Sequence, residues 1–405
     1  MIAMKNPEGK PGRPWAVLAL VVLIGINLRP FLAAPGPLLV DIGHDLGMSL
    51  EGISVLTLLP MLLMGIGAFV SPRIQAAIGT RRGMLIALSV LAIGSILRLE
   101  ASSGVLLILT AALCGASVAF IQAAFPGIIK ENFPNSIAVV TGLYSAVIMG
   151  GGALGARAMP ALTNMGFSWR AALAWLAAPA VIALAAAWLT LKEARSARPD
   201  KNLVGHLLSR PRTWALMAAF GLVNGGYSSV ITWLAPYYQS LGWRSADSAN
   251  LVAIMAICQA VAALALPALA RHGTDRRPWL LLTLAMQAIG FAGLAFSPDS
   301  AAAFWVGICG AGLGSSFALA IVTALDHLPH PEQAGALVAL MQGGGFLLAS
   351  VAPLLLALLH DWTGTYSAGW IMHIGFVAVT SALYLSFKPE SYAAATRLNG
   401  LAPGI

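Results

Sequence analysis

Twelve apolar segments, most of them long enough to cross a bilayer, run through this 405-residue chain and leave few folds open to it. Hydrophobic residues make up 59% of the sequence and charged residues only 9%, whereas soluble domains carry about 25% charged residues. We therefore predict an all-α integral membrane protein. The predicted spans cover residues 15–40, 51–71, 83–98, 102–129, 138–162, 169–191, 213–239, 246–270, 278–297, 302–325, 333–358 and 367–387.

Basic residues are distributed unevenly around these spans. Eighteen of the 23 lysines and arginines fall on the side that holds both termini, four fall on the other side, and Arg29 lies inside the first span. Cytoplasmic loops of membrane proteins carry such an excess. We expect a multi-pass monomer in a bacterial-type inner membrane, surrounded by lipid, with both termini cytoplasmic. The net charge of +8 then reflects topology and not a nucleic-acid partner.

The chain divides into two similar halves. The longest connection is basic and polar, so we predict a six-helix bundle over residues 1–191, a cytoplasmic linker over 192–212 and a second six-helix bundle over 213–405. Adding 195 to the residue number carries the Cys-Gly-Ala of 114–116 onto 309–311. Adding 193 carries the three glycines of 150–152 onto 343–345. The halves are therefore expected to be parallel repeats.

Arg29 is the leading site candidate, because it lies midway along the first apolar span. An arginine at the centre of a membrane helix costs about 2.5 to 3.5 kcal/mol on insertion scales, so it usually faces a bundle interior or a watery cavity. No aspartate or glutamate occurs at mid-depth in any predicted span. We therefore predict that Arg29 binds an anionic substrate, and a fixed hydrogen-bonded brace between helices is the alternative.

Polar residues on two spans extend this site. Pro30 follows Arg29, and a proline in a helix frees a carbonyl one turn earlier and weakens the helix there. Asn27 lies beside the loosened turn. On the seventh span, which takes the place of the first in the second half, Asn224 and Tyr227 flank two glycines. Tyr227 either encloses a small flat ligand or packs between helices.

Four glutamines lie within apolar spans, namely Gln122, Gln259, Gln287 and Gln342. An amide donates to an anion without adding charge, which suits a site that must release its ligand. Interhelical hydrogen bonds are the competing use of such residues. Tyr144 on the fifth span either faces a cavity or packs against other helices.

Two other arginines lie near the ends of spans. We expect Arg157 to extend to the membrane interface, as long basic side chains do. We expect Arg98 to pair with Glu100 at the rim of the membrane.

Four segments give the chain a family resemblance: 25–30 (Gly-Ile-Asn-Leu-Arg-Pro), 222–227 (Leu-Val-Asn-Gly-Gly-Tyr), 324–327 (Ala-Leu-Asp-His) and 340–343 (Leu-Met-Gln-Gly). Together with the repeats, they resemble the cyanate transporter (CynX) subfamily of the major facilitator superfamily, to which nitroimidazole exporters are related. The resemblance implies two six-helix bundles with pseudo-two-fold symmetry and a substrate held near mid-membrane between them. It also implies that Gln122 and Gln342 lie on cavity-lining helices.

The loop after the second span meets the superfamily signature only in part, because Gly79 and the two arginines after it fit but the expected aspartate is absent. Aspartate does occur in the matching loop of the second half. Glu131 and Asp326 fall at matching cytoplasmic helix ends, where gate contacts and plain solvated ends are both plausible. We predict gating residues at Arg81, Arg82, Glu131, Asp275, Arg276 and Asp326.

These features predict a secondary active or facilitative transporter of a small anion, with cyanate implied by the resemblance, that works by rocker-switch alternating access. Efflux of a neutral drug-like or nitroimidazole-type compound is the alternative. A membrane-embedded enzyme is disfavoured because no His-Glu-x-x-His or Gly-x-Ser-x-Gly motif occurs. We expect no cofactor or metal, since the cysteines lie unpaired within apolar segments, at Cys114, Cys258 and Cys309.

Overall fold

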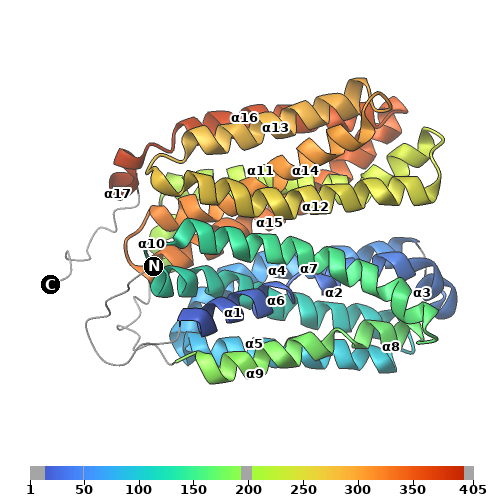
Figure 1. The fold of residues 1–405 in the computed structure, drawn as a ribbon, viewed down its shortest axis with the longest axis horizontal. Helices are drawn as coiled ribbons and strands as arrows, with labels where there is room; N and C mark the ends of the chain where they lie inside the picture. The colour runs from blue at the N-terminus through green and yellow to red at the C-terminus, as the bar shows by residue number, and fades with distance from the viewer. Residues whose placement is uncertain (1–13, 49, 193–202, 396–405) are drawn as a thin grey trace.

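The computed structural model describes residues 14–48, 50–192 and 203–395, which form a bundle of membrane-length helices (Figure 1). Twelve stretches of helix in this part of the chain are long and apolar enough to cross a membrane. A bilayer core offers no hydrogen-bond partners, so a spanning segment must satisfy its backbone groups internally, as a helix does. The predicted all-α membrane fold and its number of spans are confirmed.

The first six spans lie together in the lower half of Figure 1. They are α1 (Pro14–Gly25) with α2 (Pro30–Ala33), α4 (Leu50–Ile78), α5 (Thr80–Ile96), α6 (Gly104–Asn132), α7 (Ile137–Asn164), and α8 (Trp169–Ala174) with α9 (Ala177–Thr190). The short pieces between them are η1 (Gly36–Leu38), α3 (Leu39–Leu46) and η2 (Leu97–Glu100).

The other six spans form the upper half of Figure 1. They are α11 (Pro211–Ser240), α12 (Ser245–Leu269), α13 (Arg277–Phe296), α14 (Ala302–Asp326), α15 (Pro331–Thr363) and α16 (Ser367–Leu385). The short pieces are α10 (Leu203–Leu208), η3 (Ala270–His272), η4 (Pro389–Ser391) and α17 (Tyr392–Ala395). Residues 193–202 of the predicted linker lie outside the described residues, and α10 falls in its described part.

The first span, predicted over residues 15–40, is interrupted. A turn over residues 26–29 separates α1 from α2, and α2 contains only 4 residues before η1 and α3 continue the chain. Two prolines explain the interruption, because Pro30 and Pro35 have no N–H to give to the carbonyl one turn earlier. The weakening expected before Pro30 is therefore a complete break in the helix.

The internal repeat of the sequence reappears in the packing. A Cβ atom added at Gly115 of α6 would lie 2.7 Å from Pro60 of α4, and one added at Gly310 of α14 would lie 2.7 Å from the backbone of Met255 of α12. Gly310 and Met255 each follow their first-half counterparts by 195 positions. The same close contact therefore joins the same pair of helices in each half, and it requires a residue without a side chain.

Two pairs of helices pack closely across the boundary between the halves. On one side α4 lies against α15, where a Cβ at Gly65 would lie 3.2 Å from the carbonyl oxygen of Gly343. On the other side α7 lies against α12, where a Cβ at Gly142 would lie 2.9 Å from the carbonyl oxygen of Ala263. Small residues let membrane helices approach this closely. The halves therefore touch backbone to backbone on both sides of the centre.

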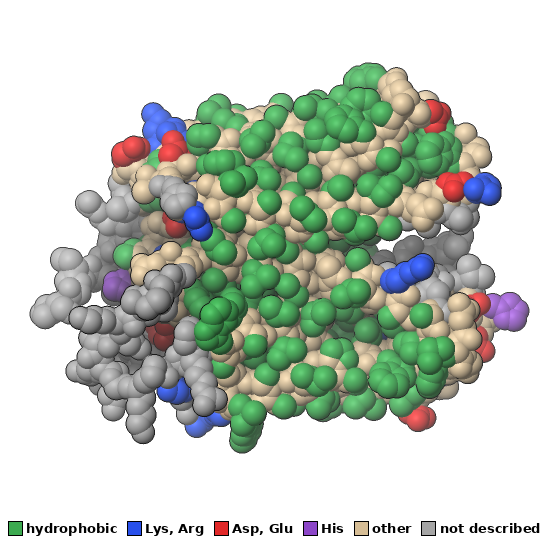
Figure 2. Space-filling model, in the orientation of Figure 1, with side chains coloured by type: hydrophobic (Ala, Val, Ile, Leu, Met, Phe, Trp, Pro, Cys, Tyr) green, Lys and Arg blue, Asp and Glu red, His purple; other side chains and the backbone are tan. Residues whose placement is uncertain are grey.

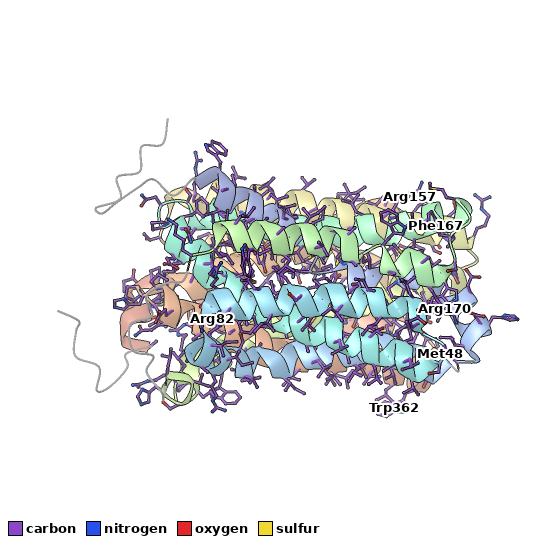
Figure 3. All side chains as sticks on the ribbon, turned by 90° about the horizontal axis from the view of Figure 1, so that it is seen from below. Met48, Arg82, Arg157, Phe167, Arg170 and Trp362 are labelled. Carbon is purple, nitrogen blue, oxygen red and sulfur yellow. The ribbon has the colours of Figure 1, made fainter. Side chains whose placement is uncertain are left out.

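The two ends of the molecule differ. We call the end where α1 begins and α16 ends the terminal end; Arg82 lies there, whereas Arg157 and Arg170 lie at the opposite end (Figure 3). At the terminal end the halves touch, since a Cβ at Gly127 of α6 would lie 3.4 Å from the carbonyl oxygen of Pro331 of α15. At the opposite end the surface is hollowed between the halves (Figure 2). This conformation is closed at the terminal end.

Candidate substrate site between the two halves

Arg29 lies at the break in the first span, as the N-cap residue of α2. Its side chain is only 3% exposed, and none of its guanidinium nitrogens has a hydrogen-bond partner among the described residues. The ion pairs of this part of the chain do not include it either. A guanidinium has five N–H donors and is unfavourable to bury without partners. This arrangement can bind an anion through several charge-assisted hydrogen bonds.

Tyr227 of α11 contacts Arg29 from the other half. The guanidinium carbon of Arg29 lies 5.2 Å from the centre of the Tyr227 ring, a cation–π contact. Such contacts contribute about 0.5 to 2 kcal/mol and use the face of the ring, so they leave the N–H donors available. Arg29 and Tyr227, which come from the equivalent first and seventh spans, therefore meet where the two halves face each other.

The glycine-rich part of α7 makes room for the break. A Cβ at Gly151 would lie 2.4 Å from the carbonyl oxygen of Ile26, and one at Gly152 would lie 3.1 Å from the Cβ of Arg29. These contacts bring the backbone around Arg29 directly against α7. Close helix packing accounts for the glycines here.

Replacing Gly151 with alanine is expected to destabilise the protein by about 1 to 3 kcal/mol, because the added methyl group overlaps the backbone of the break. The matched control is Gly150→Ala, since a Cβ at Gly150 would meet nothing within 4 Å. Alanine is favoured over glycine in a helix by about 0.5 to 1 kcal/mol. In thermal unfolding in detergent, we expect Gly151→Ala to have a lower melting temperature than wild type. The melting temperature of Gly150→Ala should equal or exceed that of wild type. Equal shifts in both variants would contradict this account.

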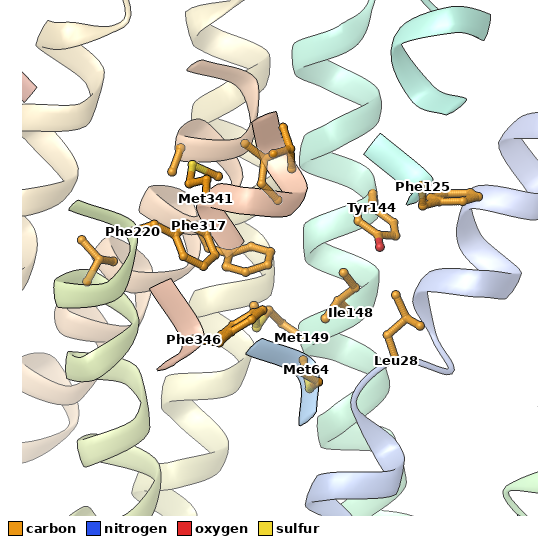
Figure 4. Close-up of a cluster of buried hydrophobic side chains, with 14 of the residues drawn as sticks. Leu28, Met64, Phe125, Tyr144, Ile148, Met149, Phe220, Phe317, Met341 and Phe346 are labelled. Atoms are coloured by element: carbon orange, nitrogen blue, oxygen red, sulfur yellow. The ribbon is translucent and has the colours of Figure 1, made fainter. Parts of the chain in front are cut away.

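Tyr144 of α7 is also buried at this place. Its ring packs against Phe125 of α6 with centroids 5.2 Å apart, and its hydroxyl has no hydrogen-bond partner among the described residues. Figure 4 shows the hydroxyl on the side where Leu28 and Ile148 lie. Tyr144 is close enough to Arg29 for an electrostatic interaction. Its hydroxyl is therefore a neutral donor near the guanidinium.

The remaining polar candidates are buried, but within the described ranges no hydrogen bond or ring contact joins them to Arg29. Asn27 donates to the carbonyls of Leu23 and Pro179, which ties the break to α9. Asn224 donates to Phe220 in its own helix. Neither amide atom of Gln122 has a partner among the described residues. Two further glutamines are each 2% exposed, Gln259 on α12 and Gln342 on α15.

Two residues outside the proposed site are used for packing. Gln287 of α13 donates to Ser316 and to the carbonyl of Gly312, both on α14. Trp233 donates to the carbonyl of Pro353 on α15. Both side chains link neighbouring helices of the second half.

The predicted gating residues lie at the terminal end, but the hydrogen bonds and ion pairs of Arg81, Arg276 and Asp275 stay within one half. Arg81 donates to the carbonyls of Trp188 in α9 and of Leu191, the C-cap residue of that helix. Arg276 pairs with Asp326 at 2.9 Å, and Asp275 pairs with its close neighbour Arg277 at 2.7 Å. Glu131 is exposed at the end of α6, and Arg82 is also exposed.

Lys130 makes a hydrogen-bonded contact between the halves that was not predicted from the sequence. Its ammonium donates to the carbonyls of Leu325 and Leu328, at the C-terminal end of α14 in the other half. The side chain is 9% exposed. Lys130 and Leu325 lie 195 positions apart, so the repeat itself brings two equivalent helix ends together. The internal repeat is the sequence feature that indicates this contact. From that repeat, only Glu131 and Asp326 were predicted to lie at equivalent helix ends.

Comparison with known proteins identifies the family. Residues 16–329 match the family model described as Major Facilitator Superfamily. The chain belongs to the major facilitator superfamily. It is 39% identical over 378 residues to the cyanate transport protein CynX of Escherichia coli (strain K12), which covers 93% of this chain and 98% of that protein. It is 27% identical over 374 residues to the 2-nitroimidazole transporter of the same organism, with 91% and 94% covered.

Solved structures of the superfamily share the fold. The proton:xylose symporter XylE matches with a TM-score of 0.76 at 13% identity, over 91% of this chain and 94% of XylE. The transporter FucP in the outward conformation matches with a TM-score of 0.71 at 14% identity, over 92% of this chain and 99% of FucP. The predicted family and fold are confirmed, and this major facilitator is a multi-pass membrane transporter and not a membrane-embedded enzyme.

Two groups of this major facilitator that lie outside its spans have shifted pKa values. Burial lowers the pKa of His327, just after α14, to about 4, with a contribution from the nearby cations Arg212 and Lys130 and against the effect of a backbone hydrogen bond to Thr323. Hydrogen bonds from Trp169 and then Arg170 lower the pKa of Asp45 at the opposite end. At neutral pH, His327 is therefore uncharged and Asp45 is ionised.

The prediction of a rim pair between Arg98 and Glu100 is wrong. Arg98 is 0% exposed, and its Nη2 donates to the carbonyl of Phe31 in α2 at 3.3 Å. Glu100 is exposed. Arg157 is exposed at the opposite end, in agreement with the expected interfacial position (Figure 3).

Proposed function

We propose that this major facilitator carries a small anion, with cyanate as the first candidate, and that Arg29 binds it. The observation that carries the proposal is the buried guanidinium of Arg29, whose nitrogens have no hydrogen-bond partner in the described part of the chain. An anion would replace the missing partners and the missing counter-charge. The relative at 39% identity is a cyanate transport protein, which supports a small anion as the substrate.

Neutral groups complete the proposed site around this charge. The amide of Gln122 and the hydroxyl of Tyr144 are buried, and both lack hydrogen-bond partners among the described residues. Neutral donors strengthen binding without the additional charge that would slow release. Tyr227 holds the guanidinium from the second half. The other residues of the proposed site are Asn27, Asn224, Gln259 and Gln342.

In the proposed cycle the two halves rock about the central site and open it to each side in turn. The excess of basic residues in the loops of the terminal end supports an inner-membrane orientation with cytoplasmic termini. The hollow in Figure 2 then faces the outside of the cell. Opening of the terminal end breaks the contacts of Lys130, and we propose that the arginines and carboxylates of the predicted gate change partners at that step.

Efflux of a neutral nitroimidazole-type compound is the second candidate. The specific observation in its favour is the 27% identity to a 2-nitroimidazole transporter over 91% of this chain. In that case the guanidinium of Arg29 would donate hydrogen bonds to a nitro group. The two candidates differ in whether a charged competitor or a neutral one displaces the substrate.

Uptake of labelled cyanate into proteoliposomes tests the proposal. We expect saturable uptake that other small anions inhibit and that neutral 2-nitroimidazole does not. An imposed pH gradient shows whether a proton travels with the anion, because the described spans offer no carboxylate at mid-depth as a separate proton carrier. Absence of cyanate uptake by folded protein, together with transport of 2-nitroimidazole, would replace the proposal by the second candidate.

A further inference from the structure

Arg98 is a second buried arginine that the proposed site does not use. It lies in η2, at the end of the third span, and is 0% exposed. Its Nε and Nη1 atoms have no hydrogen-bond partner among the described residues, and its Nη2 donates to the backbone carbonyl of Phe31 at 3.3 Å. A complete positive charge is thus buried beside one backbone carbonyl. Such an arrangement is costly and requires an explanation.

The carbonyl of Phe31 lacks its usual helical donor. Ala34 has helical backbone angles, φ −63° and ψ −36°, and its N–H bonds to the carbonyl of Pro30 at 2.8 Å. The next residue in this pattern, Pro35, would donate to Phe31, but proline has no N–H. An unpartnered buried carbonyl is unfavourable. Arg98 supplies the hydrogen bond that Pro35 cannot make.

The short helix α2 determines where the backbone of Arg29 lies. The carbonyl of Arg29 accepts the N–H groups of Leu32 and Ala33, each at 3.1 Å. A helix of 4 residues is not stable by itself, so α2 depends on its neighbours. At its start, Pro30 lies against α7, where a Cβ at Gly155 would come within 2.7 Å. At the next residue, Phe31, the hydrogen bond from Arg98 to the backbone carbonyl holds α2 in place.

We propose that Arg98 is a positioning residue, whose hydrogen bond to the carbonyl of Phe31 holds α2 so that Arg29 is placed to bind the anion. This inference rests on the proposed function, since an anion is what the positioned Arg29 binds. Loss of the bond lets α2 move without removing any group that touches the substrate. Anion affinity therefore falls, whereas the maximal rate changes less.

The test is a rescue experiment with Arg98→Met and Pro35→Ala. Arg98→Met removes the donor, and we expect the KM for cyanate uptake in proteoliposomes to rise about tenfold, the effect of one lost charge-assisted hydrogen bond. Pro35→Ala adds a backbone N–H at the position of the usual donor. The double variant should recover most of the affinity, and Pro35→Ala alone should behave as wild type. A rise in KM that Pro35→Ala does not reverse would overturn the proposal, because charge or packing would then explain it.

Hydrogen exchange provides a readout that needs no substrate. We expect Arg98→Met to speed amide exchange in the peptide covering residues 30–38, Pro35→Ala to restore protection, and the exposed control Arg157→Met to change nothing. If the wild-type protein does not transport cyanate, the proposed function is wrong. Amide hydrogen exchange in residues 30–38 still tests whether Arg98 holds α2 in place. Unchanged exchange in Arg98→Met would overturn that role. If Arg98→Met does not fold, Arg98→Gln provides the same comparison, because its shorter side chain lacks the guanidinium that donates to Phe31.

Discussion

Replacing Arg29 with glutamine is expected to abolish anion transport and to leave the empty carrier at least as stable as wild type. Charge-assisted hydrogen bonds contribute about 1.5 to 3 kcal/mol each, so loss of two lowers anion affinity at least about 100-fold. The empty protein loses a buried charge without hydrogen-bond partners in the described part of the chain, together with its cation–π contact with Tyr227, which contributes only about 0.5 to 2 kcal/mol. Insertion of such a charge costs about 2.5 to 3.5 kcal/mol. Cyanate uptake and thermal unfolding in detergent measure the two effects.

The matched control for this variant is Arg157→Gln, because Arg157 is exposed at the opposite end (Figure 3). It should transport as wild type does. Arg29→Lys keeps the charge but lacks the planar fork of donors, so its affinity should be intermediate. A brace between helices makes the opposite prediction, since its removal lowers stability. Normal transport with a lower melting temperature in Arg29→Gln would therefore identify Arg29 as a brace.

Replacing Lys130 with methionine is expected to shift the carrier towards conformations that are open at the terminal end. The ammonium donates to the carbonyls of Leu325 and Leu328 across the two halves. These carbonyls lie at a helix C-terminus, which carries a partial negative charge. A hydrogen bond from a charged group contributes about 1.5 to 3 kcal/mol. Loss of this link therefore changes the ratio of closed to open conformations by roughly 10-fold to 100-fold.

Distances between spin labels at the terminal end measure this shift. Ala77 of α4 and Thr274, between η3 and α13, are exposed residues of the two halves and provide suitable positions after replacement of the native cysteines. We expect Lys130→Met to increase the population with the longer distance. The exposed residue Lys192 provides the control, Lys192→Met, which should leave the distribution unchanged. An unchanged distribution in Lys130→Met would show that this contact does not keep the end closed.

Most of the fold could be predicted because its causes are local or periodic. A long apolar segment must become a helix in lipid, whatever its neighbours are. The repeated glycines could be predicted to mark equivalent packing, and Gly115 with Pro60 and Gly310 with Met255 form the equivalent contacts. The break before α2 was only partly predicted. Pro30 was recognised as a weak point, but the effect of Pro35 on the same short segment was not.

The sequence predicted which residues belong to the candidate site better than it predicted the contacts that those residues make. Arg29 was identifiable from sequence because a charge without a mid-depth partner is unusual in any membrane span. Its contact with Tyr227 fits the equivalence of the first and seventh spans. Asn27, by contrast, donates to the backbone of α9, and Arg98 is buried instead of lying at the rim. These orientations depend on the rotation of each helix about its axis, which the packing of several helices decides.

The sequence by itself determined that this chain crosses a membrane twelve times as two related halves and buries one arginine at mid-span. These properties follow from hydrophobicity, repetition and the cost of a buried charge, which are all visible residue by residue. Only the tertiary structure decided which donors remain without partners, which carbonyl Arg98 supports and how Lys130 joins the halves. Each of these depends on distances of a few ångströms between segments far apart in the chain, because hydrogen bonds and charge pairs are short-ranged.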